Sequence, residues 1–290
     1  MPKDTDTELK RLIASVALNE TEKPALLTFL QQYHPQTKLL YRYRSLMKFA
    51  REKEALENNK IWLSYFEDLN DPFETSMGVD SANHIPAEPV DSAFLINETG
   101  FSFNSAGLAQ MFLSNEDDKL MQDTVMGHLA NAQHNYGRYA HLASFCETSN
   151  NLLLWAHYAS DHKGICVGYS REALFEYFGA QLLPVIYDEH RCQFGGEQQR
   201  AIEDAFGRFV VKSPEWEYEQ EWRIIKHHPE PNTGGAVDVP MPCEIYLGCR
   251  IDPEHENNLR ALCESKGIAV YKMSLHPAEF KLNDNKNAEE

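Results

Sequence analysis

The sequence has no uncharged apolar run near the ~18 residues that a membrane-spanning helix needs. Its first residues do not place an apolar core behind a basic segment, as a secretory signal does. The six cysteines form no CxxC pair, so they predict neither a zinc site nor a disulfide framework. These absences predict a cytoplasmic protein without a membrane segment, whose cysteines are buried reduced thiols.

Positive charge is scarce. There are 27 Lys and Arg residues against 44 Asp and Glu, a formal net charge of -17. A chain of this charge repels polyanions, so we expect neither generic nucleic-acid binding nor binding to anionic membranes. A local basic pocket for a small nucleotide is compatible with it. No Gly-rich phosphate loop follows a predicted strand, which argues against Rossmann and P-loop folds.

What is present is typical of a packed protein, because 42% of the residues are hydrophobic and 11% aromatic. Helical and strand-like segments alternate at irregular lengths, which predicts an α+β fold. We expect a mixed, largely antiparallel sheet, either continuous or split, with flanking helices. Three parts are predicted: an N-terminal helical extension at 1–36, an α+β domain at 37–282 and a polar tail at 283–290.

Periodicity gives the elements of the α+β domain. Strands are expected at 38–44, 60–65, 141–147, 163–170, 182–189, 219–227, 243–248 and 267–273. Helices are expected at 46–58, 151–160, 195–212 and 253–265.

The first strand carries two arginines among tyrosines. Alternation directs Tyr41 and Tyr43 to one face and Arg42 and Arg44 to the other. Two arginines side by side can grip a phosphate or carboxylate of a substrate. The structural alternative is an edge strand with a solvated charged face.

The apolar helix at 151–160 carries Trp155, His157 and Tyr158. We expect His157 or Tyr158, or both, to line a pocket, although a hydrogen-bonded core histidine is a common alternative. In the turn at 69–74, Asn70 and Asp71 can bond nearby backbone groups. We expect this turn to rim the same pocket, and its alternative is a purely structural turn.

A stripe of carboxylates is the third candidate. Counted by twos along a strand, Glu217, Glu219, Glu221 and Arg223 share one face, and Trp222 belongs to the opposite, core face. Carboxylates so close raise each other's pKa unless a cation balances them. They suit the stabilisation of a developing positive charge, such as a sugar oxocarbenium ion. The alternative is an exposed edge strand protected by charges.

Five segments together resemble one bacterial family, the domain of unknown function DUF2971. They are LYRYRSL, NKIWLSYFEDLNDPFE, SFCETSNNLLLWAHYASDHKGICVGY, EWEYEQEWRII and EIYLG. The resemblance runs from Leu39 to near Lys281 and leaves the N-terminal helices outside. The DUF2971 resemblance implies that these residues form one folded domain, but it implies no activity.

The order of the motifs also resembles ADP-ribosyltransferases of the arginine–serine–glutamate class. Arg44 or Arg42 takes the place of the arginine on the first core strand, and Phe145–Ser149 resembles the aromatic-x-Ser-Thr-Ser strand. Glu219 and Glu221 resemble the Glu-x-Glu pair. The sequence departs from the pattern at Glu147, where the first serine is expected, which puts NAD binding there in doubt.

The second resemblance implies NAD as the substrate, without a metal. Glu221 would stabilise the oxocarbenium ion, and Glu219 would orient the acceptor, whose nature the sequence does not indicate. It further implies that Arg44 holds a phosphate or ribose, that Tyr43 or Trp155 stacks on nicotinamide, and that Ser149 or Thr148 braces the carboxylate.

Two other functions use the same residues. One is metal-dependent processing of a nucleotide or phosphate ester by an effector of bacterial defence or toxin type. The other is a module that senses a nucleotide or binds a protein without catalysis.

Overall fold

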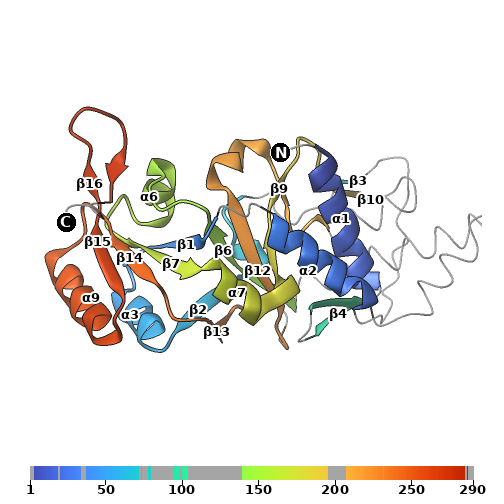
Figure 1. Ribbon diagram of the computed structural model, residues 1–290, viewed down its shortest axis with the longest axis horizontal. Helices are drawn as coiled ribbons and strands as arrows, with labels where there is room; N and C mark the ends of the chain where they lie inside the picture. The colour runs from blue at the N-terminus through green and yellow to red at the C-terminus, as the bar shows by residue number, and fades with distance from the viewer. Residues whose placement is uncertain are drawn as a thin grey trace, which may run out of the picture.

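The structure is a computed structural model of the chain (Figure 1). It describes residues 3–18, 20–33, 37–71, 73, 78–79, 94–97, 100–103, 139–194, 207–230, 232–284 and 286. None of the helices in these ranges is both long and apolar enough to span a membrane.

A nine-stranded sheet forms the centre of the molecule, in the order β13-β2-β6-β1-β7-β14-β15, with β12 joining β6 to β8. Strands β14 and β15 run parallel, and the other neighbours in this sheet run antiparallel. The α+β prediction with a mixed, largely antiparallel sheet is therefore confirmed. The strands are β1 (Leu39–Arg44), β2 (Lys60–Tyr65), β6 (Ala140–Cys146), β7 (Ile165–Ser170), β8 (Leu182–Pro184), β12 (Glu221–His227), β13 (Gly235–Asp238), β14 (Glu244–Leu247) and β15 (Ala269–Lys272).

Two strands share one edge of β6. Tyr41 of β1 pairs with Cys146 near the end of β6, whereas Ser64 of β2 pairs with Leu142 near its start. On its other edge β6 pairs with β12 along its whole length. The strands that carry Arg42 and Arg44, Phe145 and Cys146, and Glu221 are thus neighbours, and the sheet forks between β1 and β2.

Helices cover both faces of this sheet. In Figure 1, α6 (Leu152–Tyr158) lies above it, whereas α3 (Phe49–Glu57) and α9 (Pro253–Lys266) lie below. The other helices are α1 (Lys3–Leu18), α2 (Lys23–Gln32) and α7 (Arg171–Phe178), with 3-10 turns η1 (Glu20–Glu22), η2 (Phe66–Asp68), η3 (Gly179–Gln181) and η4 (Pro214–Glu219). Short strands complete the fold: β3 (Gly78–Val79), β4 (Phe94–Asn97), β5 (Gly100–Phe103), β9 (Ile186–Tyr187), β10 (Gln193–Phe194), β11 (Val211–Lys212), β16 (Ser274–Leu275) and β17 (Leu282–Asn283).

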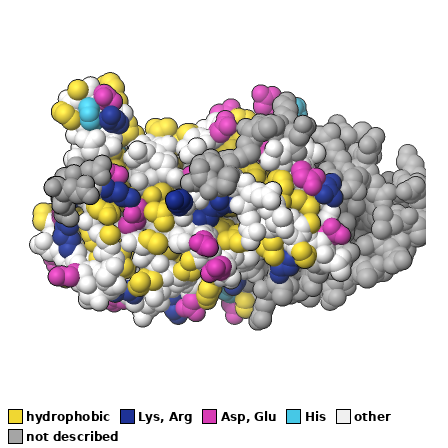
Figure 2. All heavy atoms as spheres, in the orientation of Figure 1, with side chains coloured by type: hydrophobic (Ala, Val, Ile, Leu, Met, Phe, Trp, Pro, Cys, Tyr) yellow, Lys and Arg dark blue, Asp and Glu magenta, His cyan; other side chains and the backbone are white. Residues whose placement is uncertain are grey.

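The buried side chains form two apolar clusters. The smaller one lies between the sheet and α6 and contains Tyr43, Cys146 and Trp155. The larger one includes most of the remaining sheet and also the N-terminal helices, where Leu9 and Leu30 are fully buried. The N-terminal helices therefore share their core with the sheet. Basic and acidic side chains are interspersed over the described part of the face in Figure 2.

The structure corrects two expected elements next to the carboxylates. The segment before β12 is not strand but η4, which begins at Pro214, and Gln220 then turns the chain with a left-handed φ of 46°. Glu217 and Glu219 therefore do not continue the strand face of Glu221. The expected helix at 195–212 ends instead in the strand β11, and residues 195–206 lie outside the described ranges.

The turn between α6 and β7 approaches the backbone at the end of β14. Ser160, Asp161 and His162 all have left-handed φ values, of 49°, 55° and 67°. This turn leaves the His162 carbonyl so close to Gly248 that a Cβ there would overlap with it. A side chain at this position can be accommodated only if the backbone moves, which favours glycine.

We expect Gly248→Ala to lower the free energy of unfolding by about 3 kcal/mol, because the backbone at His162 must move. Gly267 is the control. It ends α9 with a left-handed φ of 68° but has open space for a Cβ, so Gly267→Ala should cost only about 1 kcal/mol. Urea denaturation measures both. Equal losses would show that the contact at Gly248 is not tight.

Candidate active site

A cavity of about 180 Å³ opens at the fork of the sheet. Side chains from β1, β6, α6, β11, η4 and β12 converge on it. Those that line it include Tyr41, Arg42, Tyr43, Arg44, Ser64, Asn70, Asp71, Ser144, Cys146, Leu154, Tyr158, Lys212, Trp216, Glu219 and Glu221.

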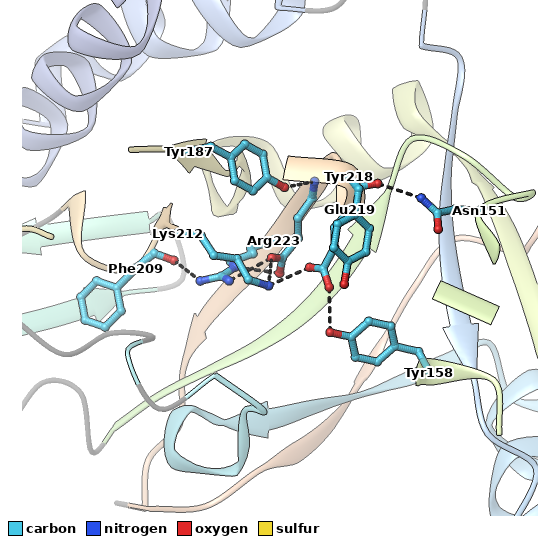
Figure 3. Close-up of polar contacts among 9 residues, drawn as sticks. Asn151, Tyr158, Tyr187, Phe209, Lys212, Tyr218, Glu219 and Arg223 are labelled. Atoms are coloured by element: carbon cyan, nitrogen blue, oxygen red, sulfur yellow. Dashed lines mark hydrogen bonds and ion pairs between the residues drawn. The ribbon is translucent and has the colours of Figure 1, made fainter. Parts of the chain in front are cut away.

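The cavity contains a buried cluster of alternating charges (Figure 3). Lys212 donates from Nζ to Glu219 Oε2 at 2.7 Å and to Glu221 Oε2 at 3.1 Å. Arg223 donates from Nε to Glu221 Oε1 at 2.8 Å and from Nη2 to Oε2 at 3.0 Å. The Lys212 ammonium thus joins the two carboxylates, and the Arg223 guanidinium holds that of Glu221.

Neighbouring groups fix the ends of this cluster. The Tyr158 hydroxyl donates to Glu219 Oε1 at 2.8 Å. Arg223 donates from Nη1 to the Phe209 carbonyl at 2.9 Å. The Lys212 ammonium lies 4.7 Å from the centre of the Trp216 ring. Few alternative positions remain for these side chains, so the site is preorganised.

Local structure brings the cluster together. Pro214 begins η4, where its missing N–H costs nothing, and the η4 turn carries Glu219 back beside Lys212. The left-handed Gln220 then reverses the chain into β12, where Glu221 and Arg223 point to the same face.

The surroundings shift the pKa values of the two carboxyl groups in opposite directions. Burial alone would raise the pKa of Glu221, but Arg223 and Lys212 outweigh it and lower that pKa to about 2. Burial raises the pKa of Glu219 above its ordinary value in spite of Lys212, and the Glu221 charge adds to the rise. Glu221 is therefore a fixed anion, and Glu219 is the group suited to exchange a proton.

The same geometry bears on metal binding. A divalent ion shared by Glu219 and Glu221 would have to lie between their carboxylates, where Lys212 places its ammonium. The cluster thus already contains its bridging cation. This arrangement does not favour the metal-dependent interpretation for this pair of residues.

The arginines predicted to bind substrate border the cavity but belong to the opposite face of the sheet. Tyr41, Cys146 and Glu221 are aligned across β1, β6 and β12, so their side chains share a face. Arg44 projects the other way, where Glu52 accepts from its Nε at 2.9 Å and from its Nη2 at 2.8 Å.

Of the two residues proposed on α6, Tyr158 lines the cavity and His157 is exposed. On the turn, Asn70 and Asp71 also line the cavity. The Asn70 side chain lies near the Tyr158 hydroxyl, and Asp71 Oδ1 accepts from the Phe73 N–H at 2.8 Å. The turn thus contacts the α6 side of the cavity.

Of the other proposed residues, Tyr43 lines the cavity, whereas Thr148, Ser149, Trp155 and Arg223 do not. Trp155 is fully buried and donates from Nε1 to the Ser149 carbonyl at 2.8 Å. The Thr148 carbonyl accepts from the Tyr43 hydroxyl at 3.0 Å. Arg223 is also fully buried, so it acts on Glu221 rather than on a ligand.

Sequence reasoning missed three residues of the site: Lys212, Trp216 and Ser144. Lys212 fell at the end of an expected helix, where a lysine is ordinary. Trp216 was missed because the segment from Glu217 to Arg223 was interpreted as one strand, and Trp216 directly precedes it. Ser144 could have been found, because it lies two residues before Cys146 in a predicted strand. Its side chain lines the cavity and lies close enough to Glu221 to help lower the pKa of that carboxyl.

A family model described as "Protein of unknown function (DUF2971)" matches residues 154–224. This match confirms the DUF2971 resemblance. No curated protein and no solved structure matches the chain. The DUF2971 segment begins on α6 and ends on β12, and it contains Tyr158 and the whole charge cluster from Lys212 to Arg223.

Removing one partner of the buried cluster should destabilise the fold. We expect Arg223→Met to lower the free energy of unfolding by about 3–5 kcal/mol, because it leaves the Glu221 carboxylate buried with less compensation. Arg260→Met removes an exposed i,i+4 pair with Glu256 and should cost less than about 1 kcal/mol. Thermal denaturation compares the two variants. A small loss for Arg223→Met would mean that Glu221 is not held as an anion.

Proposed function

We propose that this protein cleaves the bond between nicotinamide and ribose in NAD and transfers the ADP-ribose to an acceptor. One observation carries the proposal. The arginines lie on β1, Phe145 and Cys146 on the neighbouring β6, and Glu221 at the start of the next strand, β12, just after Glu219 of η4. Residues of all three motifs line one cavity, which contains the carboxylate pair. The proposal combines this placement with the resemblance of the motifs.

The chemistry requires a base for the acceptor. When the bond from nicotinamide N1 to ribose C1′ breaks, nicotinamide leaves with the electron pair as a neutral molecule. The acceptor oxygen or nitrogen then bonds C1′ and loses a proton. We assign that proton to Glu219, whose pKa is raised and whose neighbours Tyr158 and Lys212 hold its carboxylate at the cavity.

Glu221 has a positioning role in this proposal. Both of its oxygens accept hydrogen bonds from Arg223, and one also accepts from Lys212. Its permanent negative charge orients Lys212 and contributes to the field that a developing oxocarbenium ion meets. Ser144, on the same strand face, lies where it can hold a ribose hydroxyl.

The cavity volume limits what enters it. About 180 Å³ is below the roughly 300–1,000 Å³ of sites that enclose a drug-sized ligand. We therefore place only the nicotinamide-ribose end of NAD inside. Trp216, half-buried at the wall, is the aromatic side chain offered to the nicotinamide ring in place of the buried Trp155.

One observation favours a second candidate, a module that binds a nucleotide without turning it over. Glu221 is buried and its oxygens are already bonded, which suits a structural cluster beneath a binding surface. The two candidates differ in turnover, since a sensing module binds NAD or a related nucleotide and releases no nicotinamide.

We expect Glu219→Gln to reduce nicotinamide release from NAD by about 10²–10³-fold, with NAD affinity nearly unchanged, because the amide cannot accept the proton. Chromatography of the released nicotinamide measures the rate, and calorimetry measures affinity. Glu217→Gln is the matched control. Glu217 is exposed on the same η4 turn and should be replaceable. Wild-type protein that neither binds NAD nor releases nicotinamide, with or without acceptors, refutes the proposal.

The pH dependence separates the two carboxylates. As a base, Glu219 works when ionised, so the rate should fall as the pH drops through its pKa, which lies above the ordinary 4.5. Glu219→Gln should lack this acid limb in its residual activity. If the limb lies near pH 2, where Glu221 titrates, then Glu221 is the base and our assignment is wrong.

A further inference from the structure

A second cavity, of about 460 Å³, lies on the opposite face of β1. Its floor is formed by β1 and β7, where Arg42 is aligned with Val167 and Arg44 with Ile165. Helix α3 covers it, and β2 closes one side. Its volume lies within the roughly 300–1,000 Å³ of small-molecule sites.

The lining of this cavity is basic in a chain of net charge -17. Arg42, Arg44 and Arg51 line it with two carboxylates, Glu52 and Glu54. Lys60 also lines it, but lies 3.9 Å from the Asp238 carboxylate. Positive charge therefore exceeds negative charge at this point, against the trend of the chain.

Glu52 is shared between two of the arginines. It accepts from Arg44 Nε and Nη2 and, through Oε1, from Arg51 Nη2 at 2.8 Å. A single carboxylate cannot neutralise both guanidiniums. The arginines consequently retain capacity for a further anion.

Arg42 has no such carboxylate in the described structure. Its side chain is only 7% exposed, and its Nη2 donates to the Trp62 carbonyl at 2.6 Å. Its Nη1 is buried and has no hydrogen-bond partner in the structure described. Burial, together with the nearby Arg44 charge, lowers the pKa of Arg42 to about 9. A buried donor left unpaired is costly, so the charge of Arg42, whose side chain lines this cavity, is incompletely compensated.

We propose that this second cavity binds a small phosphate-bearing ligand of nucleotide size, held by Arg42, Arg44 and Arg51. Three guanidiniums match the two negative charges and the acceptor oxygens of a phosphate. Glu52 acts as the internal competitor that holds Arg44 and Arg51 when the cavity has no anion. The site differs from the Glu219 cavity and does not depend on NAD cleavage.

The test is calorimetric binding of AMP to the full chain, with adenosine as the uncharged control. We expect saturable AMP binding and at least tenfold weaker binding of adenosine, because the phosphate supplies the charge-assisted bonds. Arg51→Gln should weaken AMP binding about tenfold. Lys53→Gln removes the same charge from α3 at a residue that pairs with Glu57, and should change the affinity less than twofold. Glu52→Gln should tighten binding several-fold by releasing Arg44 and Arg51.

Three outcomes overturn the proposal: no AMP binding to the wild type, equal binding of adenosine, or equal effects of Arg51→Gln and Lys53→Gln. Trp216→Ala, which removes the aromatic wall of the first cavity only, locates the bound AMP. If that variant loses AMP binding while Arg51→Gln retains it, AMP occupies the first cavity and the second-site proposal fails. Failure of nicotinamide release leaves this result untouched, because binding and turnover are measured separately.

Discussion

The pairing of β6 is the constraint on which the rest of the structure depends. Its one edge is taken by β12, and its other edge is divided between β1 and β2. Neither of these two strands can follow β6 along its full length, so the sheet must fork. Arg42 bridges the fork by donating from β1 to the Trp62 carbonyl on β2. The space that the ladder leaves open becomes the first cavity, and the side chains of β6 and β12 point into it.

The fork also determines where the scarce cations are used. In this acidic chain Lys212, Arg223, Arg42 and Arg171 are buried rather than spread over the surface. Buried cations require several partners, because the free-energy cost of removing the charge from water exceeds the energy gained from a single contact. Lys212 and Arg223 are paired with Glu219 and Glu221, whereas Arg171 donates to the backbone carbonyls of Leu30 in α2 and of Tyr33 just after it. These charges therefore hold distant segments together, at the first cavity for Lys212 and Arg223 and at the N-terminal helices for Arg171.

Much of the fold could be predicted, because the spacing of hydrophobic residues along the sequence reflects which side chains are buried in each helix or strand. The strand at 60–65 and the helix that ends before Gly267 were expected within one or two residues of the observed elements. The segment from Pro214 to Gln220 could not be predicted in this way. Its geometry depends on one left-handed residue, Gln220, which no hydrophobic pattern reveals, although Pro214 is a signal for the start of a helical turn. Lys212 was missed for the same reason, since its role arises only when η4 brings Glu219 back beside it.

The placement of the arginines shows why motif order alone does not define a site. A strand alternates its side chains, so residues that are neighbours in sequence face different surroundings. On β1 the residues that share a face with Glu221 are Tyr41 and Tyr43, and Arg42 and Arg44 point toward α3. The Arg42–Tyr43–Arg44 sequence therefore contributes to two cavities at once.

In the first cavity, the cation beside the carboxylates is supplied from β11 by Lys212. In the second, the arginines face one shared carboxylate, Glu52, and the unpaired Nη1 of Arg42. A resemblance that assigns Arg44 and Glu221 to one ligand overlooks that their side chains leave the sheet on opposite faces and meet only at the edge of the first cavity.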